Sequence, residues 1–347
     1  MKEWPFVSVV IPMRNERRWI ERSLAAVLAQ DYPGERFEVL VADGMSDDGS
    51  RDILARIARA DQRVRVIDNP GRIVPTGLNA AIQAARGEII ARVDAHTIIA
   101  PDYLRRGVEA LERTGADGVG GPMVAIGGGA VGDAIARAMS SRFGIGAAFH
   151  FADRECEADT VYMGMWPRRV FARVGLFDEE LVRDQDDEFH YRLRKHGGRL
   201  VLTPAMRSRY QNRQSWRALA RQFFQYGYWK VRVLQKHPRQ MSVRHFVPPL
   251  FDLGVLGALA AFPFSPQVAL LGAAGAGAYA AVTLLVSTIE GRGVAGRLRL
   301  ALAFATIHHA WAAGFLVGLV RFAPRWGEAE QRCPALELDP GMRRDGS

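Results

Sequence analysis

The chain has 347 residues, 48% of them hydrophobic and 24% charged, values that are ordinary for a folded globular protein. Its formal net charge of +9 suits phosphorylated substrates or anionic lipid, but no zinc-finger or RNA-binding motif is present, so we expect no nucleic-acid partner. The two cysteines, Cys156 and Cys333, stand in no motif, which argues against a disulfide framework.

The first hundred residues alternate short apolar runs with amphipathic stretches. The runs predict strands, the first two of them buried on both faces, and the stretches between the runs predict helices. Such alternation predicts βαβ units and an α/β fold with a mainly parallel sheet, which binds ligands at the carboxyl ends of its strands. Acidic residues follow each of the expected strands 6–11, 37–42, 64–67 and 88–93, namely Glu16, Asp43, Asp68 and Asp94.

Between residues 115 and 210 the pattern is less regular. A glycine-rich segment, 115–132, predicts a strand over 118–125 and a loop. We expect a helix and turn over 168–177, a charged helix over 181–196 and a strand over 199–203. The N-terminus lacks the long apolar core of a signal peptide, so we expect this part of the chain in the cytosol.

The C-terminal third is largely apolar. A helix is expected over 213–235, where basic residues mixed with aromatic ones fit either a membrane-surface helix or a core-packing helix. Three apolar stretches follow, and the second is uncharged and long enough to span a bilayer. The first is short and carries Asp252, so it fits a re-entrant or interfacial segment as well as a span. The stretches are 246–262, 267–287 and 298–320.

Arginines between the last two stretches indicate a cytosolic loop. The sequence leaves two arrangements open, namely two membrane spans with an interfacial segment, or three membrane spans. We expect the protein in a bacterial inner (cell) membrane, with its catalytic domain on the cytoplasmic side. The predicted division is a catalytic domain over 1–210, interfacial helices over 211–245, membrane helices over 246–322 and a polar tail over 323–347.

Asp94-Ala95-His96 ends the fourth expected strand with two potential metal ligands one residue apart. A divalent cation at that edge would bind the diphosphate of a nucleotide-activated substrate. Imidazole binds Mn²⁺ well and Mg²⁺ less well, so His96 favours Mn²⁺, with Mg²⁺ as the alternative cofactor.

The chain resembles the inverting family-2 glycosyltransferases, which carry a GT-A-type nucleotide-sugar domain. Within that family it most resembles the succinoglycan-type (ExoA-like) exopolysaccharide glycosyltransferases. The resemblance is specific because four motifs keep the family's order and spacing, and the first three run through the first hundred residues. The motifs are 7–16 (VSVVIPMRNE), 39–50 (VLVADGMSDDGS), 69–96 (beginning NPGRIVPTGLNAA) and 184–197 (DQDDEFHYRLRKHG).

The resemblance implies a donor pocket lined by these motifs. Asp43 is suited to accept the hydrogen bond of a nucleobase, and Pro12 and Glu16 can border the base and the ribose. Asn79 and Arg86 belong to the segment that lines the donor pocket in the family. The triplet Asp94-Ala95-His96 at the end of the 69–96 motif departs from the family's D-x-D, because His96 stands in place of the second aspartate.

The resemblance also assigns the base that an inverting transferase needs to deprotonate the acceptor hydroxyl. Aligned on Arg192-Leu193-Arg194, the family's acidic stretch becomes residues 185–188, and Asp186 takes the base position. Glu188 is a neighbouring acid that we include among the substrate-binding residues. Residues 211–216 do not match the Q-x-x-R-W motif of processive synthases, which predicts transfer of a single sugar.

The sequence therefore predicts a membrane-bound inverting hexosyltransferase. Its donor would be a nucleotide sugar, with UDP-hexose the first candidate, and its acceptor a polyprenyl-linked saccharide in exopolysaccharide or cell-surface glycan synthesis. Membrane lipid would be its other partner. The alternatives are a polyprenyl-phosphate glycosyltransferase and, because of His96 and Gln185, an inactive nucleotide-sugar-binding protein.

Overall fold

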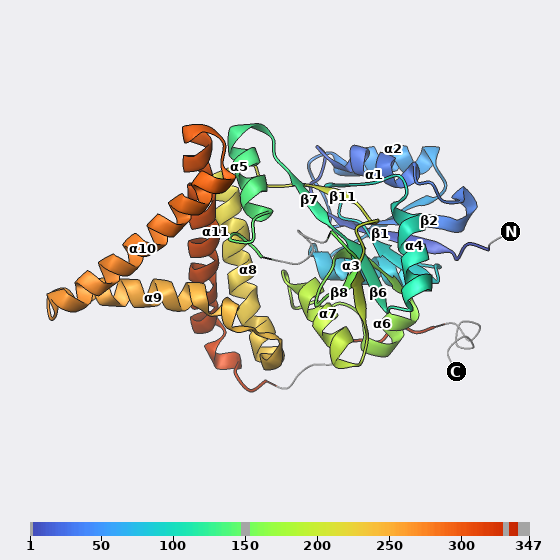
Figure 1. The fold of residues 1–347 in the computed structure, drawn as a ribbon. Coiled ribbons are helices and arrows are strands. Elements are labelled where there is room, and N and C mark those ends of the chain that lie inside the picture. The colour runs from blue at the N-terminus through green and yellow to red at the C-terminus, as the bar shows by residue number, and fades with distance from the viewer. Residues whose placement is uncertain (1–2, 147–152, 329–332, 339–347) are drawn as a thin grey trace. The chain divides into compact units, whose positions relative to one another are not determined.

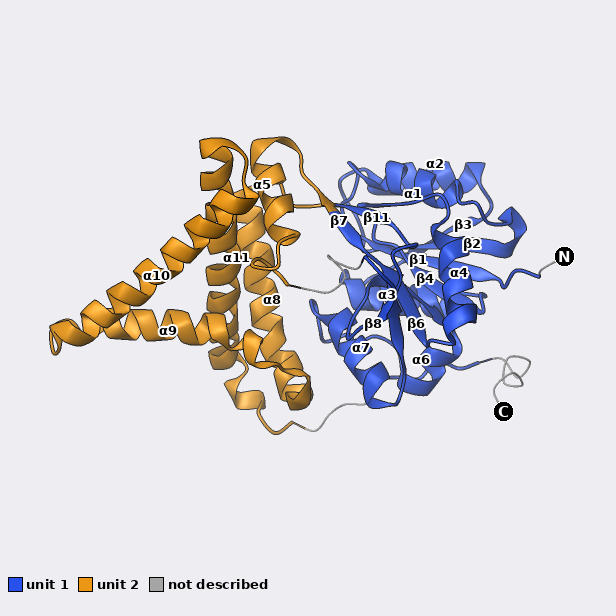
Figure 2. Ribbon diagram, in the orientation of Figure 1, with its two compact units in different colours: residues 1–124, 148–210, 331–347 blue, residues 125–147, 211–330 orange. Residues whose placement is uncertain are grey.

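The computed structural model describes residues 3–146, 153–328 and 333–338, and the chain forms two compact units (Figure 2). Unit 1 comprises residues 1–124, 148–210 and 331–347, and unit 2 comprises 125–147 and 211–330. Segment 125–147 thus groups with the C-terminal helices, although the predicted division keeps it in 1–210. Of the predicted polar tail, 333–338 belongs to unit 1, and 329–332 and 339–347 lie outside the described residues.

An eight-stranded sheet forms the centre of unit 1, in the order β3-β2-β1-β4-β9-β6-β10-β8 (Figure 1). The first four strands are parallel, as predicted, and β9 runs antiparallel to both β4 and β6, which makes the sheet mixed. The predicted α/β architecture, with a parallel portion formed by the first four strands of the chain, is therefore present. The strands are β1 (Val7–Met13), β2 (Phe37–Asp43), β3 (Val64–Asp68), β4 (Ile89–Arg92), β6 (Gly118–Gly121), β8 (Cys156–Glu157), β9 (Tyr162–Pro167) and β10 (Leu200–Leu202).

Helices cover both faces of this sheet. Every residue of β1 is buried, and alternate side chains enter opposite cores: Val9 packs on one face and Val10 on the other. Helices α1 (Ile20–Leu28), α2 (Ser50–Ala60) and α4 (Tyr103–Thr114) share the core of Val9. Helices α3 (Val74–Ala84), α6 (Arg169–Val174) and α7 (Gln185–Lys195) share the core of Val10.

A second, three-stranded sheet has the order β5-β11-β7. Strand β5 (Thr97–Ile99) follows the Asp94–His96 segment and pairs antiparallel with β11 (Ser208–Gln211). The third strand, β7 (Met123–Ile126), leads out of unit 1. These strands are three or four residues long, too short for a readable alternation of polar and apolar residues, so only β7 was anticipated in part.

Unit 2 is helical. The three predicted apolar stretches form α9 (Val247–Ala260), α10 (Pro266–Glu290) and α11 (Gly293–Arg321), and the basic aromatic stretch forms α8 (Trp216–Lys236). Helix α5 (Gly129–Met139) begins within the predicted glycine-rich segment 115–132 and continues beyond it, where no element was predicted. By length and composition, α10 and α11 could each cross a membrane, and α9 is shorter.

Candidate active site

Acidic side chains gather at the carboxyl edge of the parallel strands. In register, Met13 of β1 lies beside Asp43 of β2, and Asp43 lies beside Asp68 of β3. On the other side of β1, Val10 pairs with Arg92, the last residue of β4, and Asp94 follows two positions later. Glu16 comes shortly after β1. The predicted gathering of these acids is therefore present.

Two loops at this edge hold each other by hydrogen bonds. The backbone NH of Asn15 donates to Ser46 Oγ at 2.8 Å, and its side-chain amide donates to Asp47 Oδ1 at 2.9 Å. Asn15 and Met45 both adopt left-handed backbone angles, with φ of 57° and 56°. Such conformations are costly for residues other than glycine and collect at functional sites, where the surrounding contacts enforce them.

Asp43 is buried, and its carboxylate already has partners. It accepts hydrogen bonds from the backbone NH and the hydroxyl of Ser46, the latter at 2.5 Å, and from Arg51 Nη1 at 2.7 Å. Arg51 also donates to Asp68 Oδ1 at 2.6 Å and so joins two strand ends. A carboxylate offers about four acceptor positions, so these bonds leave limited capacity for a nucleobase.

His96 is held by Glu16. The two side chains are each 22% exposed, and His96 Nδ1 lies 3.0 Å from Glu16 Oε1. A second ring, Tyr210 of β11, packs edge-on at 5.2 Å between ring centroids. With Nδ1 donating to the carboxylate, Nε2 of His96 retains its lone pair, which is the arrangement of a metal-binding histidine oriented by a carboxylate.

The donor set at this edge fits part of a metal coordination shell. Asp94 supplies a carboxylate and His96 an imidazole nitrogen, two ligand types that Mn²⁺ accepts. Among the described residues, no group of three or more His, Cys, Asp or Glu side chains could hold a metal ion. Two protein ligands would therefore need oxygen atoms from water or a bound substrate to complete the shell.

Arg92 connects Asp94 with Asp186. Its Nε donates to Asp94 Oδ1 at 2.8 Å, and its Nη1 lies 3.7 Å from Asp186 Oδ2. Burial alone would lower the pKa of Arg92, but the two carboxylates outweigh it and raise the pKa, so the guanidinium stays charged. A buried cation thus lies between the predicted metal ligand and the predicted base.

Asp186 lies in the first turn of α7. The residue before the helix, Asp184, is left-handed with φ of 61°, and Asp186 is 36% exposed and accepts a 3.0 Å hydrogen bond from the NH of Asp187. In the same helix, burial lowers the pKa of His190 to about 4, so this imidazole is neutral at neutral pH. Its Nδ1 lies 2.9 Å from Thr160 Oγ1.

Glu188 is engaged elsewhere. Its carboxylate is buried and pairs with Arg192 one turn along α7, at 2.8 and 3.0 Å. Arg192 also donates to the main-chain carbonyl oxygens of Val174, Gly175 and Leu176 at the end of α6. This network fastens α7 to α6, and a substrate-binding role for Glu188 stays a prediction that would require the pair to open.

Asn79 and Arg86 are not brought to the strand ends. The side chain of Asn79 is buried and bonds the NH and carbonyl of Phe177. Arg86 pairs with Glu38, near the start of β2, and so lies at the opposite edge of the sheet from Asp43. Their donor-binding roles stay predictions, whereas Pro12 lies next to Met13 at the carboxyl edge.

The sequence analysis did not identify two arginines of the site, Arg92 and Arg51. Arg92 stands alone within an apolar strand, and a lone charge at a strand position buried on both faces signals a buried acidic partner. Arg51 gave no such signal, because its helix is amphipathic and arginine is common on such surfaces.

The sequence profile of the Glycosyl transferase family 2 matches residues 8–175. Succinoglycan biosynthesis protein ExoA of Rhizobium meliloti (strain 1021) is 32% identical over 323 residues, which cover 91% of this chain and 96% of that protein. The chain belongs to glycosyltransferase family 2. A second relative of this transferase is the dolichyl N-acetyl-alpha-D-glucosaminyl phosphate 3-beta-D-2,3-diacetamido-2,3-dideoxy-beta-D-glucuronosyltransferase of Methanococcus voltae. The two sequences are 28% identical over 67% of this chain and 74% of that protein.

Solved structures agree on the fold of this family 2 glycosyltransferase. Mannosyltransferase PcManGT from Pyrobaculum calidifontis, solved with GDP-Man and Mn²⁺, superposes with a TM-score of 0.57 at 19% identity, covering 91% of this chain and 87% of that one. Residues 1–349 of TarS from S. aureus superpose with a TM-score of 0.52 at 17% identity, covering 92% of each chain. Both likenesses support the GT-A-type fold.

Proposed function

We propose that this family 2 glycosyltransferase is a membrane-bound, inverting, metal-dependent enzyme. It transfers one sugar from a nucleotide sugar, with UDP-hexose as the first donor to test, to a polyprenyl-linked saccharide. The observation that carries the proposal is the place of Arg92, whose guanidinium contacts Asp94 and lies 3.7 Å from Asp186. One buried cation thereby ties the carboxylate proposed for the donor to the carboxylate proposed for the acceptor.

Asp94 and His96 would hold a divalent ion, Mn²⁺ or Mg²⁺, which neutralises diphosphate charge when bound. Glu16 orients His96 through Nδ1, and Arg92 orients Asp94 through Oδ1. The loops of Asn15 and Asp47, which hydrogen-bond each other, would form the adjoining wall for the nucleoside. These residues fix the direction from which the donor presents its anomeric carbon.

Asp186 would act as the base. The acceptor hydroxyl oxygen attacks the anomeric carbon as the bond from that carbon to the diphosphate oxygen breaks. The hydroxyl proton passes to the Asp186 carboxylate, and the nucleoside diphosphate departs with the bonding electron pair. Attack from the face opposite the leaving group inverts the anomeric configuration. Asp186 is partly exposed, so an acceptor can reach it.

Two further observations support a lipid-linked acceptor. Unit 2 carries two helices of membrane-crossing length and apolar composition. The Methanococcus voltae relative is named for transfer to a dolichyl-phosphate-linked sugar. A membrane-bound transferase with an acceptor in the same membrane is the simplest reading of both, and we place its catalytic unit at the cytosolic surface of a bacterial inner membrane.

The test is the mass of the product. Membranes containing the full chain are incubated with one nucleotide sugar at a time, Mn²⁺ or Mg²⁺, and polyprenyl-diphosphate-linked mono- or disaccharides, and the lipid extract is analysed. The proposal predicts a lipid-linked saccharide longer by a single sugar. A sugar attached directly to added polyprenyl phosphate would instead favour the alternative activity, and no product from any donor would contradict both.

A further inference from the structure

We propose that unit 2 binds the membrane from one side only. Helix α9 and the first half of α10 form a hairpin that dips into a single leaflet, and α11 lies along the membrane surface instead of crossing it. The inference rests on the membrane attachment within the proposed function and goes beyond it. It does not depend on the sugar chemistry.

A polar cluster marks the base of this hairpin. His309 of α11 lies 2.9 Å from the carboxylate of Asp252 in α9, and His308 lies 3.0 Å from the hydroxyl of Tyr279 in α10. The rings of Tyr279 and His309 are 5.0 Å apart. Ionisable side chains are costly within hydrocarbon, so this cluster indicates the level where polar headgroups begin.

Beyond the cluster, residues 253–278 contain no charged side chain. Large apolar side chains point outward along this segment, including Phe264 at the tip, which is 90% exposed, and Leu271, which is 71% exposed. Helix α9 has 14 residues and is about 21 Å long, short of the ~30 Å hydrocarbon core. The part of α10 before Tyr279 is about 20 Å long. Each arm of the hairpin is therefore long enough to reach the middle of the bilayer and too short to cross it.

Helix α11 cannot cross the bilayer with lipid on all its sides, because α8 packs along its C-terminal half. The backbones approach closely where Gly314 meets Phe224 and Gly318 meets Tyr228. Helix α8 carries five basic side chains, so a crossing by α11 would draw charges into hydrocarbon. Figure 1 shows α8 on one side of α11 and the tip of the α9–α10 hairpin projecting to the other. The basic residues of α8 are Arg217, Arg221, Lys230, Arg232 and Lys236.

The chain also returns to the unit from which it left. After unit 2, residues 333–338 pack within unit 1, where the NH of Leu176 donates to Pro334 O at 2.8 Å and the NH of Leu336 donates to Phe171 O at 3.1 Å. The number of crossings in unit 2 must therefore be even. Helix α9 is too short for a crossing and α11 is covered by α8, so a lone crossing by α10 is excluded as well.

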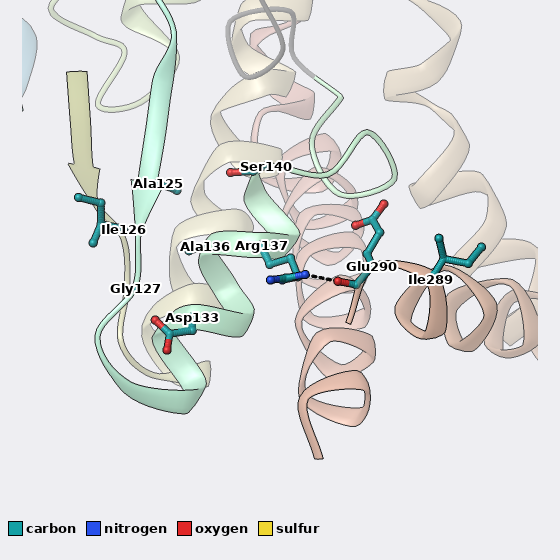
Figure 3. Close-up of a pocket in the computed structure, with 9 residues that line it drawn as sticks. All are labelled: Ala125, Ile126, Gly127, Asp133, Ala136, Arg137, Ser140, Ile289 and Glu290. Atoms are coloured by element: carbon teal, nitrogen blue, oxygen red, sulfur yellow. Dashed lines mark hydrogen bonds between the residues drawn. The ribbon is translucent and has the colours of Figure 1, made fainter. Parts of the chain in front are cut away.

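The far end of α10 is held by polar contacts. Arg137 of α5 donates to the main-chain carbonyl of Glu290 (Figure 3). Ser141 Oγ donates to Glu290 Oε1 at 3.0 Å. Arg137 and Glu290 border an open hollow of about 700 Å³ that Asp133 also lines. Charged groups here fit the headgroup level rather than hydrocarbon.

Exposed arginines lie in the sequence before α9 and after α10. Arg244 comes shortly before α9, Arg292 follows the end of α10, and Arg297 lies near the start of α11. Basic residues that flank an apolar insertion bind anionic headgroups. The occupant of this surface is therefore one leaflet of a bilayer that contains anionic lipid.

The test uses single-cysteine forms of the full chain in sealed vesicles that contain anionic lipid. Native Cys156, exposed in unit 1, is kept alone in a C333A protein and reports the side of the catalytic unit. Ser265→Cys at the hairpin tip and Val320→Cys near the end of α11 are each placed in a C156S, C333A background. A membrane-impermeant maleimide is added from either side.

We expect Val320→Cys to react from the same side as Cys156. Ser265→Cys should react from neither side, and a bimane probe attached there in detergent should be quenched most by spin labels near the bilayer centre after reconstitution. Reaction of either variant from the side opposite Cys156 would overturn the proposal by showing a crossing. Reaction of Ser265→Cys from the side of Cys156 would overturn it by showing a hairpin outside the lipid. No readout requires turnover, so a failure here is distinct from a failure of the sugar transfer.

Discussion

The guanidinium of Arg92 lies between two carboxylates that come from different parts of the fold. Asp94 follows the same strand and contacts Nε at 2.8 Å, whereas Asp186 lies on α7 with its Oδ2 3.7 Å from Nη1. Planar guanidinium groups bind carboxylates through two or more directed NH groups, which a lysine ammonium cannot reproduce. The spacing between the proposed metal ligand and the proposed base therefore depends on an arginine.

Arg92→Lys tests this dependence while retaining the positive charge. We expect kcat to fall about 10²-fold, because a small misplacement of reacting groups costs that much. The thermal unfolding temperature should change little by comparison, since Asp94 and Asp186 still have a cation nearby. Steady-state kinetics alongside thermal unfolding make the measurement, and wild-type turnover by Arg92→Lys would contradict a positioning role.

His96→Asp tests the metal site. An aspartate at this position creates the all-oxygen ligand pair that suits Mg²⁺, so the ratio of Mn²⁺ to Mg²⁺ activation should fall. Glu16→Gln should weaken metal activation about 10- to 100-fold by loosening the imidazole. His196→Asp, at the far end of α7, is the matched control. An unchanged metal preference in His96→Asp would show that His96 is not a ligand.

The sequence predicted the sheet and its acidic edge well because the first four strands are short, largely apolar runs that are followed by polar residues. Helical stretches separate these runs, and parallel pairing brings the carboxyl ends of the strands together. Short elements such as β5 and β11 escaped because three or four residues carry too little pattern. Helix α5 escaped because its glycines read as loop residues.

Side-chain partners were harder to predict. Glu188 and Asp186 lie two positions apart in one acidic stretch, yet the first pairs with Arg192 in the interior and the second reaches the strand ends. Which acid faces the site depends on the rotation of α7 about its axis. That rotation follows from tertiary packing of Phe189 and Leu193, which spacing alone does not specify.

Glu188→Gln should destabilise the protein. The change removes one charge of a buried pair and leaves Arg192 uncompensated, at a cost of about 3–5 kcal/mol in the free energy of unfolding. Glu155→Gln, which breaks a partly exposed pair with Arg113, should cost no more than about 1 kcal/mol. Urea unfolding measures both. A fully stable Glu188→Gln protein with a raised donor KM would instead support the substrate-binding role predicted for Glu188.

His190 should make stability fall in acid. Its pKa is about 4 in the folded protein against 6.5 for an ordinary histidine, because burial disfavours the charged form. Between these pH values the unfolded chain therefore binds more protons than the folded protein. The contribution of His190 to the free energy of unfolding is complete above pH 6.5 and is lost as the pH falls toward 4. The loss is about 3 kcal/mol.

His190→Asn removes the titrating group and keeps a polar atom near Thr160. The free energy of unfolding of this variant, followed from pH 7 to pH 4, should decline less steeply than that of the wild type. Parallel curves for the two proteins would show that His190 does not carry this dependence.

The most direct test of the account compares Asp186→Asn with Asp187→Asn, which makes the same change one residue along the same helical turn. Release of nucleoside diphosphate is followed with a nucleotide sugar, metal ion and lipid-linked saccharide. We predict that Asp186→Asn lowers acceptor-dependent kcat by about 10²- to 10⁴-fold with little change in donor KM, whereas Asp187→Asn stays close to wild type. Wild-type turnover by Asp186→Asn, or no release from any donor by the unmodified chain, would contradict a glycosyltransferase with Asp186 as its base.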